Sequence, residues 1–155
     1  MAGKIEAHIT SLGLTLPPAS APVANYVPYV RTGNLVFVSG QLPLQDGAVK
    51  YVGLVGGEVS AEDGYEAAKL CGLNLIAQAK AACDGDLDRV KRVVKLTGFV
   101  ASGAQFTDHP KVVNGASDLM VQVFGDAGRH CRAAVGAPSL PRGAAVEVEA
   151  VFEVA

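Results

Sequence analysis

The C-terminal part of the chain carries the side chains whose types and spacing best suit chemistry. Arg132 begins a segment of small and β-branched residues, and Glu147 and Glu149 lie in a second such segment after a turn-rich link, residues 138–143. If the two segments form a hairpin that turns near residues 140–141, Arg132 lies opposite about Glu149 and diagonal to Glu147, within reach of side-chain contact. A guanidinium and a carboxylate so placed can bind a small acid and act on it, or form an ordinary cross-strand ion pair. The spacing alone leaves both interpretations open.

The other reactive side chains form no comparable set. His130 and Cys131 are adjacent, and adjacent strand residues point to opposite faces, which argues against a catalytic pair. His8 and His109 lie near the starts of predicted helices and are expected to be solvated. No His, Cys or Asp cluster has the spacing of metal ligands, so we expect no metal site. The odd number of cysteines and their wide spacing predict reduced thiols at Cys71, Cys83 and Cys131.

The composition predicts a single domain with apolar surface to cover. The 155 residues suit one domain, of which residues 1–20 form a short helical extension. Only 18% of them are charged and 50% are apolar, whereas about 25% charged is typical, so we expect contacts between copies of the chain. The net charge of −2 provides no positive field for nucleic acid or anionic lipid. Because we find neither a secretory signal nor a membrane span, we expect a cytoplasmic protein.

Periodicity and turn residues predict the elements that must position these side chains. Ile5, Ile9 and Leu12 have helical spacing, and two longer helices are expected, one from a cap at Ser60 and one from Asp108. The expected strands are residues 26–30 at a sheet edge, then 35–38, 48–52, 92–100, 132–137 and 144–154. The basic residues of 89–95 are expected on a solvated strand edge. This order predicts an α+β sandwich with both long helices on one sheet face, so a second subunit is expected on the other.

Two separated motifs resemble the Rid (YjgF) family. The family's C-terminal signature is similar to residues 132–150, RAAVGAPSLPRGAAVEVEA, and its N-terminal signature to Tyr26 followed by residues 33–43, GNLVFVSGQLP. Asn114 matches a third family position. The likeness covers nearly the whole chain after residue 20. The length and the N-terminal helix look like the longer branch of the family, which carries the label "endoribonuclease L-PSP/chorismate mutase-like".

This resemblance implies a fold, an activity and a site. The fold would be a chorismate-mutase-like sandwich with a mixed β-sheet, assembled as a homotrimer with sites in the clefts between subunits. The activity would be hydrolysis of 2-imino or enamine acids, such as 2-aminoacrylate, to 2-keto acids and ammonia, without metal or organic cofactor. Arg132 would bind the substrate carboxylate, and Glu147 with the backbone carbonyl of Ala134 would hold the attacking water. The pocket would be shaped by four further residues, Tyr26, Ser39, Gly40 and Asn114.

Departures from the family pattern keep other functions open. His130-Cys131 stands where the family has a small pair, Ala134 stands where a thiol is often found, and Pro138 is expected to bulge the hairpin. The first alternative is a regulatory trimer that binds a small carboxylate-bearing imine or keto acid without efficient turnover. The second is an endoribonuclease acting on single-stranded RNA. We rank it last because we find no acid/base pair in a basic cleft, and we expect neither nucleic acid nor membrane as a partner.

Overall fold

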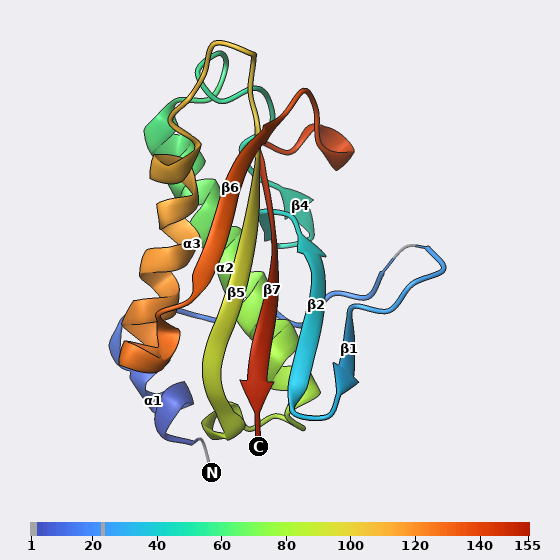
Figure 1. Ribbon diagram of the computed structural model, residues 1–155, viewed down its shortest axis with the longest axis vertical. Coiled ribbons are helices and arrows are strands. Elements are labelled where there is room, and N and C mark those ends of the chain that lie inside the picture. Colours follow the sequence, from blue (N-terminus) through green and yellow to red (C-terminus); the bar gives the residue numbers. More distant parts are fainter. Residues whose placement is uncertain (1–2, 23) are drawn as a thin grey trace.

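A five-stranded sheet carries two long helices on one of its faces (Figure 1). The computed structural model describes residues 3–22 and 24–155. The strand order is β1-β2-β7-β5-β6, with the bounds β1 (Tyr29–Thr32), β2 (Leu35–Gln41), β5 (Val90–Ala101), β6 (Cys131–Ala137) and β7 (Val146–Val154). The helices are α1 (Lys4–Ser11), α2 (Ala61–Ala82) and α3 (His109–Phe124). The shorter elements are the hairpin β3 (Leu44–Gln45) and β4 (Ala48–Val49) and the 3-10 turns η1 (Leu87–Arg89), η2 (Gly125–Gly128) and η3 (Pro141–Gly143).

Local signals in the sequence account for both long helices. The Ser60 side chain accepts the backbone N–H of Asp63 at 3.0 Å and so caps α2. Asp108 precedes α3, Pro110 lies in its first turn, and Gly125 with a φ of 62° follows its end. Tyr65 on α2 donates to Asp118 on α3 at 2.7 Å, and this bond is the main cause that raises the pKa of Tyr65 to about 12. The expected α+β architecture, with a mixed sheet and two helices on one face, is confirmed.

The predicted hairpin of the last two strands is wrong. β6 pairs in parallel with β5, and β5 also pairs antiparallel with β7, so β5 lies between β6 and β7. The cause is α3, which carries the chain back along the sheet so that the next strand runs parallel to β5. The link after Ala137 then passes the end of β5, where Ala145 donates its N–H to the carbonyl of Tyr51 at 2.9 Å. Arg132 is therefore opposite Leu96 and not opposite Glu149.

The remaining strand predictions need smaller corrections. The first strand begins at Tyr29, after Pro28, and lies at the sheet edge as expected. The strand expected at residues 48–52 is only the two-residue β4, since a positive φ of 59° at Tyr51 ends it. The basic cluster is not on a sheet edge: Lys91, Arg92 and Lys95 are exposed on the interior strand β5.

The two faces of the sheet differ in what covers them. Val148 and Phe152 of β7 are fully buried on the face that carries α2 and α3. On the opposite face the apolar side chains of Val30, Phe37 and Val135 are 54%, 45% and 44% exposed. Within the described residues no helix packs against this open face (Figure 1). Among residues 3–22 and 24–155, none of the helices has the length and hydropathy needed to cross a membrane.

Candidate functional site

The seven residues expected at the site lie in two groups. We name the first the arginine group: Arg132 and Ala134 on β6, with Asn114 on α3. We name the second the glutamate group: Glu147 on β7, Ser39 and Gly40 on β2, and Tyr26 in the segment before β1.

In the arginine group, the guanidinium lies against α3. Its Nη1 donates to Ser117 Oγ at 3.0 Å, and its Nη2 donates to the carbonyl oxygen of Pro110 at 3.2 Å. Pro110, Asn114 and Ser117 are spaced four and three residues apart, so they share one face of the helix. Asn114, which is half-buried, therefore lies on the stripe that faces the guanidinium. Ala134 follows Arg132 on the same side of β6.

A hydrogen-bonded chain positions this guanidinium. His130 Nε2 lies 2.8 Å from Ser117 Oγ, and His130 Nδ1 lies 2.7 Å from the carbonyl oxygen of Gly128. Because a carbonyl only accepts, Nδ1 carries the hydrogen, and Nε2 accepts from the hydroxyl of Ser117. Burial is the main cause that lowers the pKa of His130, and the charge of Arg132 lowers it further, which favours the neutral ring. Sequence reasoning considered His130 as a partner of Cys131 and as a departure from the family pattern. It did not consider His130 with Arg132, although residues two apart on a strand share a face.

Arg132 has no ionic partner in the part of the chain that the structure describes. The salt bridges there involve Arg89, Lys111 and Arg129. Arg132 is half-buried, and its two hydrogen bonds go to a neutral hydroxyl and a neutral carbonyl. A partly desolvated cation without an anion is unfavourable, so the arginine group is suited to bind a negatively charged ligand.

In the glutamate group, a bulge in β2 makes room for a carboxyl group. The pairing of β2 with β7 shifts between Val38 and Gln41, and Ser39 and Gly40 form the bulge. A Cβ atom at Gly40 would collide with Oε1 of Glu147, so only glycine lets the carboxyl lie there. Burial first, and the charge of Glu149 second, raise the pKa of Glu147. A carboxyl group with a raised pKa can take up and return a proton closer to neutral pH.

The same bulge holds the segment that carries Tyr26. Ser39 Oγ donates to the carbonyl oxygen of Val27 at 2.9 Å. The backbone N–H of Ser39 donates to the carbonyl oxygen of Pro28, also at 2.9 Å. Tyr26 itself is 52% exposed. The glutamate group therefore combines a half-buried carboxyl that lies against Gly40 with an exposed aromatic side chain in a segment tied to the same bulge.

The two groups do not meet within one copy of the chain. Glu147 is in register with Phe99 and Val135, and Arg132 lies three residues before Val135, so it points to the opposite face. Two strand spacings separate β7 from β6, which is about 10 Å, and three residues along β6 add about 10 Å in the other direction. The expected contact between Arg132 and Glu147 within one hairpin is therefore wrong.

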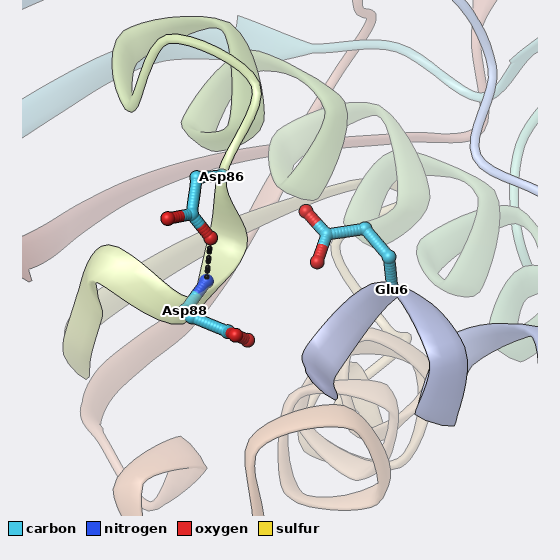
Figure 2. A group of neighbouring side chains, drawn as sticks. All are labelled: Glu6, Asp86 and Asp88. Carbon is cyan, nitrogen blue, oxygen red and sulfur yellow. Dashed lines mark hydrogen bonds between the residues drawn. The ribbon is translucent and has the colours of Figure 1, made fainter. Parts of the chain in front are cut away.

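Carboxylates also gather at Glu6, Asp86 and Asp88, where α1 meets η1 (Figure 2). Asp88 accepts the first two backbone N–H groups of α1, both at 2.9 Å, and Glu6 accepts the N–H of Leu87 at 2.9 Å. The N–H of Asp88 donates to Asp86 at 3.0 Å. The bonds from the backbone N–H groups of Ile5 first and Lys4 second lower the pKa of Asp88. Reciprocal capping of two helix starts accounts for the cluster.

Two cavities lie near these elements. The larger, about 600 Å³, lies between residues 15–20, the β3–β4 hairpin and α2, and none of the seven expected residues lines it. The smaller, about 330 Å³, lies between the end of β6 and the start of α3, next to the arginine group. His109, which was expected to be solvated, is half-buried in the wall of this second cavity.

Comparison with known proteins identifies the family. A family model described as "YjgF/chorismate mutase-like, putative endoribonuclease" matches residues 6–153. Protein TCP17 of Trypanosoma cruzi is 50% identical over 152 residues, 97% of this chain and 94% of that protein. A solved structure of a protein of unknown function from Agrobacterium tumefaciens has a TM-score of 0.92 at 50% identity and covers 97% of this chain and 92% of its own. A structure described as a putative endoribonuclease from Shewanella oneidensis MR-1 has a TM-score of 0.94 at 37% identity. The match covers 98% of this chain and 100% of that one. With both motifs inside the matched range, the chain belongs to the YjgF/chorismate mutase-like family.

Proposed function

We propose that the protein hydrolyses 2-imino or enamine acids to 2-keto acids and ammonia, at a site completed by two neighbouring copies of the chain. The observation that carries this proposal is the half-buried guanidinium of Arg132, which has no anionic partner among the described residues. A planar guanidinium binds a carboxylate through two parallel hydrogen bonds, and the α-carboxylate of a small acid fits that geometry.

The positions of the two groups favour assembly into a ring. The arginine group lies at the edge strand β6, and the glutamate group lies near the other edge, at the β2 bulge. A contact between one sheet edge of a copy and the opposite sheet edge of the next copy is heterologous. It closes into a ring when the rotation from each copy to the next divides a full turn evenly. The exposed apolar side chains of the open face, Val30, Phe37 and Val135, become buried in such an assembly. Family resemblance favours three copies, so we infer a homotrimer in which the arginine group of one copy faces the glutamate group of the next.

The chemistry then follows from the groups that converge. With the carboxylate held by Arg132, the protonated imine carbon is electrophilic, and an enamine reaches the same state by taking up a proton at its β-carbon. Glu147, with the carbonyl of Ala134 from the adjoining copy, holds a water and takes its proton as the oxygen bonds to C2. Glu147 then returns that proton to the nitrogen. As the C2–N bond breaks, the C2 hydroxyl passes its proton to Glu147 and becomes the keto oxygen, and Glu147 gives this proton to the departing ammonia, which leaves as ammonium. Such acid/base help contributes about 10²–10⁴-fold, and it needs no step on a metal or cofactor.

Asn114, Tyr26, Ser39 and Gly40 complete the pocket in this scheme. The stripe of α3 that carries Asn114 borders the guanidinium, and its amide can bind the substrate's carboxylate or nitrogen. The bulge of Ser39 and Gly40 keeps space open beside the carboxyl of Glu147. The ring of Tyr26 is free to cover the substrate, since it is 52% exposed in the single chain.

The test uses 2-aminoacrylate generated by a serine dehydratase, with semicarbazide to trap the imine that escapes hydrolysis. We expect wild-type protein to suppress the trapped product. We expect Arg132→Ala and Glu147→Gln to lose about 10²-fold or more of that activity. Arg129→Ala and Glu149→Gln are matched controls on exposed positions, and both are expected to stay active. No acceleration by wild type, or loss in Glu149→Gln with none in Glu147→Gln, contradicts the proposal.

Binding and RNA-cleavage measurements separate the proposed hydrolysis from the two alternatives. A regulatory binding protein would bind 2-keto acids, lose that binding in Arg132→Ala, and release no ammonia above background. An endoribonuclease, the activity in the description of the Shewanella relative, would cleave single-stranded RNA. That cleavage would be lost when the exposed cations Lys91, Arg92 and Lys95 of β5 are changed together.

A further inference from the structure

The smaller cavity contains a polar pair that the proposed reaction does not use. Ser102 Oγ lies 3.2 Å from His109 Nε2, and both residues line the cavity of about 330 Å³. Ser102, directly after β5, is only 6% exposed, and its backbone N–H donates to the carbonyl of Ala137 at 3.0 Å. The ring of His109 packs edge-on against Phe106, with centroids 5.4 Å apart. Backbone and aromatic contacts therefore hold the pair in one arrangement.

Glycine at position 136 keeps this pair uncovered. A Cβ atom at Gly136 would lie 2.6 Å from His109 Nε2 and 3.0 Å from Ser102 Oγ, closer than side-chain atoms pack. Any other residue there would displace the pair or seal it from the cavity. The φ of Gly136 is not among the positive values, so this contact is what requires glycine.

The cavity lies beyond the arginine group along the same two elements, β6 and α3. Arg132, Ala134 and Gly136 alternate along β6 and so share one side of the strand. On α3, His109 directly precedes Pro110, whose carbonyl accepts a hydrogen bond from Arg132. A small acid whose carboxylate is held by Arg132 can therefore extend its side chain toward Ser102 and His109.

We propose that Ser102 and His109 form a second subsite, which receives the side chain of the substrate and selects an uncharged hydrogen-bonding group, namely a carboxamide. This inference rests on the proposed function, since Arg132 must hold the other end of the molecule. Ser102 Oγ donates to the carbonyl of Val100 at 3.3 Å, which leaves its lone pairs for His109 and for a ligand. His109 then donates from Nε2 to Ser102 Oγ, and the second lone pair of that oxygen is free to accept an N–H of a carboxamide.

The lining of the cavity disfavours other side chains. None of its eight lining residues is Lys, Arg, Asp or Glu: Ser102, Gly103, Ala104, Phe106, His109, Gly136, Ala137 and Pro138. A second carboxylate or an ammonium group would find no opposite fixed charge among these residues. An apolar side chain of the same shape would leave the second lone pair of Ser102 Oγ without a donor. The substrate class is therefore the imino acids, and the corresponding keto acids, with an amide side chain.

The experiment compares three 2-keto acids of nearly equal shape by titration calorimetry. The compounds are 2-oxosuccinamate (amide), 4-methyl-2-oxopentanoate (isopropyl) and oxaloacetate (carboxylate). We expect wild type to bind the amide about 5- to 10-fold more tightly than the isopropyl compound, as one or two hydrogen bonds provide. In Ser102→Ala and Gly136→Ala we expect that ratio to fall to about 1, because the pair is removed or displaced. Gly57→Ala adds the same methyl group outside the cavity, 3.4 Å from the carbonyl of Leu54, and should keep the ratio.

The outcomes separate the subsite from the site that it extends. Equal binding of the amide and isopropyl compounds by wild type, or an unchanged ratio in Ser102→Ala, overturns the subsite and leaves the binding by Arg132 intact. Tightest binding of oxaloacetate overturns the selection of an uncharged group. Failure of wild type to bind any of the three, or full binding by Arg132→Ala, overturns the proposed function and the subsite with it. If Gly136→Ala does not fold by thermal melting, Ser102→Ala decides the question.

Discussion

Mixing two inactive variants tests whether the site is shared between copies of the chain. Arg132→Ala removes the guanidinium of the arginine group, and Glu147→Gln removes the carboxylate of the glutamate group, so each variant alone should be inactive. The two residues lie on opposite faces of one sheet, separated by β5. If neighbouring copies supply them, a copy carrying Arg132→Ala still provides an intact Glu147, and a copy carrying Glu147→Gln still provides an intact Arg132. Mixed assemblies therefore contain some complete sites.

The expected recovery follows from counting these combinations. In a ring assembled from equal amounts of the two variants, each site takes its arginine group from one copy and its glutamate group from the next. In the whole mixture each group is intact in half of the cases, so about one quarter of all sites are complete. A mixed trimer has two copies of one variant and one of the other, and about one third of its sites are complete. A site that takes both residues from one copy is never complete in these mixtures. For purified mixed trimers, a shared site thus predicts about one third of wild-type activity, and a site within one copy predicts none.

The assay is the imine-trapping reaction on co-expressed variants that carry two different affinity tags. Sequential purification on both tags retains only mixed assemblies, and native mass spectrometry gives their composition. Wild type mixed with Glu147→Gln is the positive control, and should keep about half of its activity if sites act independently. Doubly purified Arg132→Ala and Glu147→Gln assemblies that stay at background would refute the shared site, even if wild type proves active.

Three further changes follow from the bonds and pKa shifts described above. His130→Ala removes the acceptor that holds the Ser117 hydroxyl beside Arg132. It should raise the KM for imino acids about 5- to 20-fold, with a smaller effect on kcat. An unchanged KM argues against a role of His130 in positioning Arg132. Burial raises the pKa of Glu147 above its usual value of 4.5, so the folded protein loses stability as the pH rises and this carboxyl ionises. Glu147→Gln, which stays neutral, should therefore have a higher Tm than wild type at pH 8 but not at pH 4. Tyr65→Phe should lower the free energy of unfolding by about 1 kcal/mol. That loss should be present in urea titrations at pH 8 and disappear between pH 10 and 12, because the folded-state pKa of Tyr65 is raised from 10.0 to about 12; a constant loss contradicts the bond to Asp118.

Much of the fold could be predicted because its signals are local. The cap at Ser60, Pro110 in the first turn of α3 and the alternation in β7 each act within a few residues of the chain. They predicted the two long helices, the order of the elements apart from the short strand β3, and the covered face of the sheet. Strand ends were less accurate, since Pro28 and the positive φ at Tyr51 shift them by a few residues.

The candidate site was predicted as a set of residues but not as an arrangement. The motifs singled out Arg132 and Glu147 as candidate site residues, and the error concerned which strand lies beside β7. Sequence reasoning also missed His130 and the Ser102–His109 pair. His130 has a signal in its spacing from Arg132, whereas Ser102 and His109 meet only because β5 ends beside the first turn of α3.

The chain by itself determined its helices, its strands, its family and the residue types available for binding an acid. These depend on neighbouring residues, whose propensities, caps and periodicities act over one or two turns. Only the tertiary structure decided that Arg132 and Glu147 face opposite sides of the sheet, because strand pairing joins segments far apart in the chain and one intervening strand changes every cross-strand neighbour.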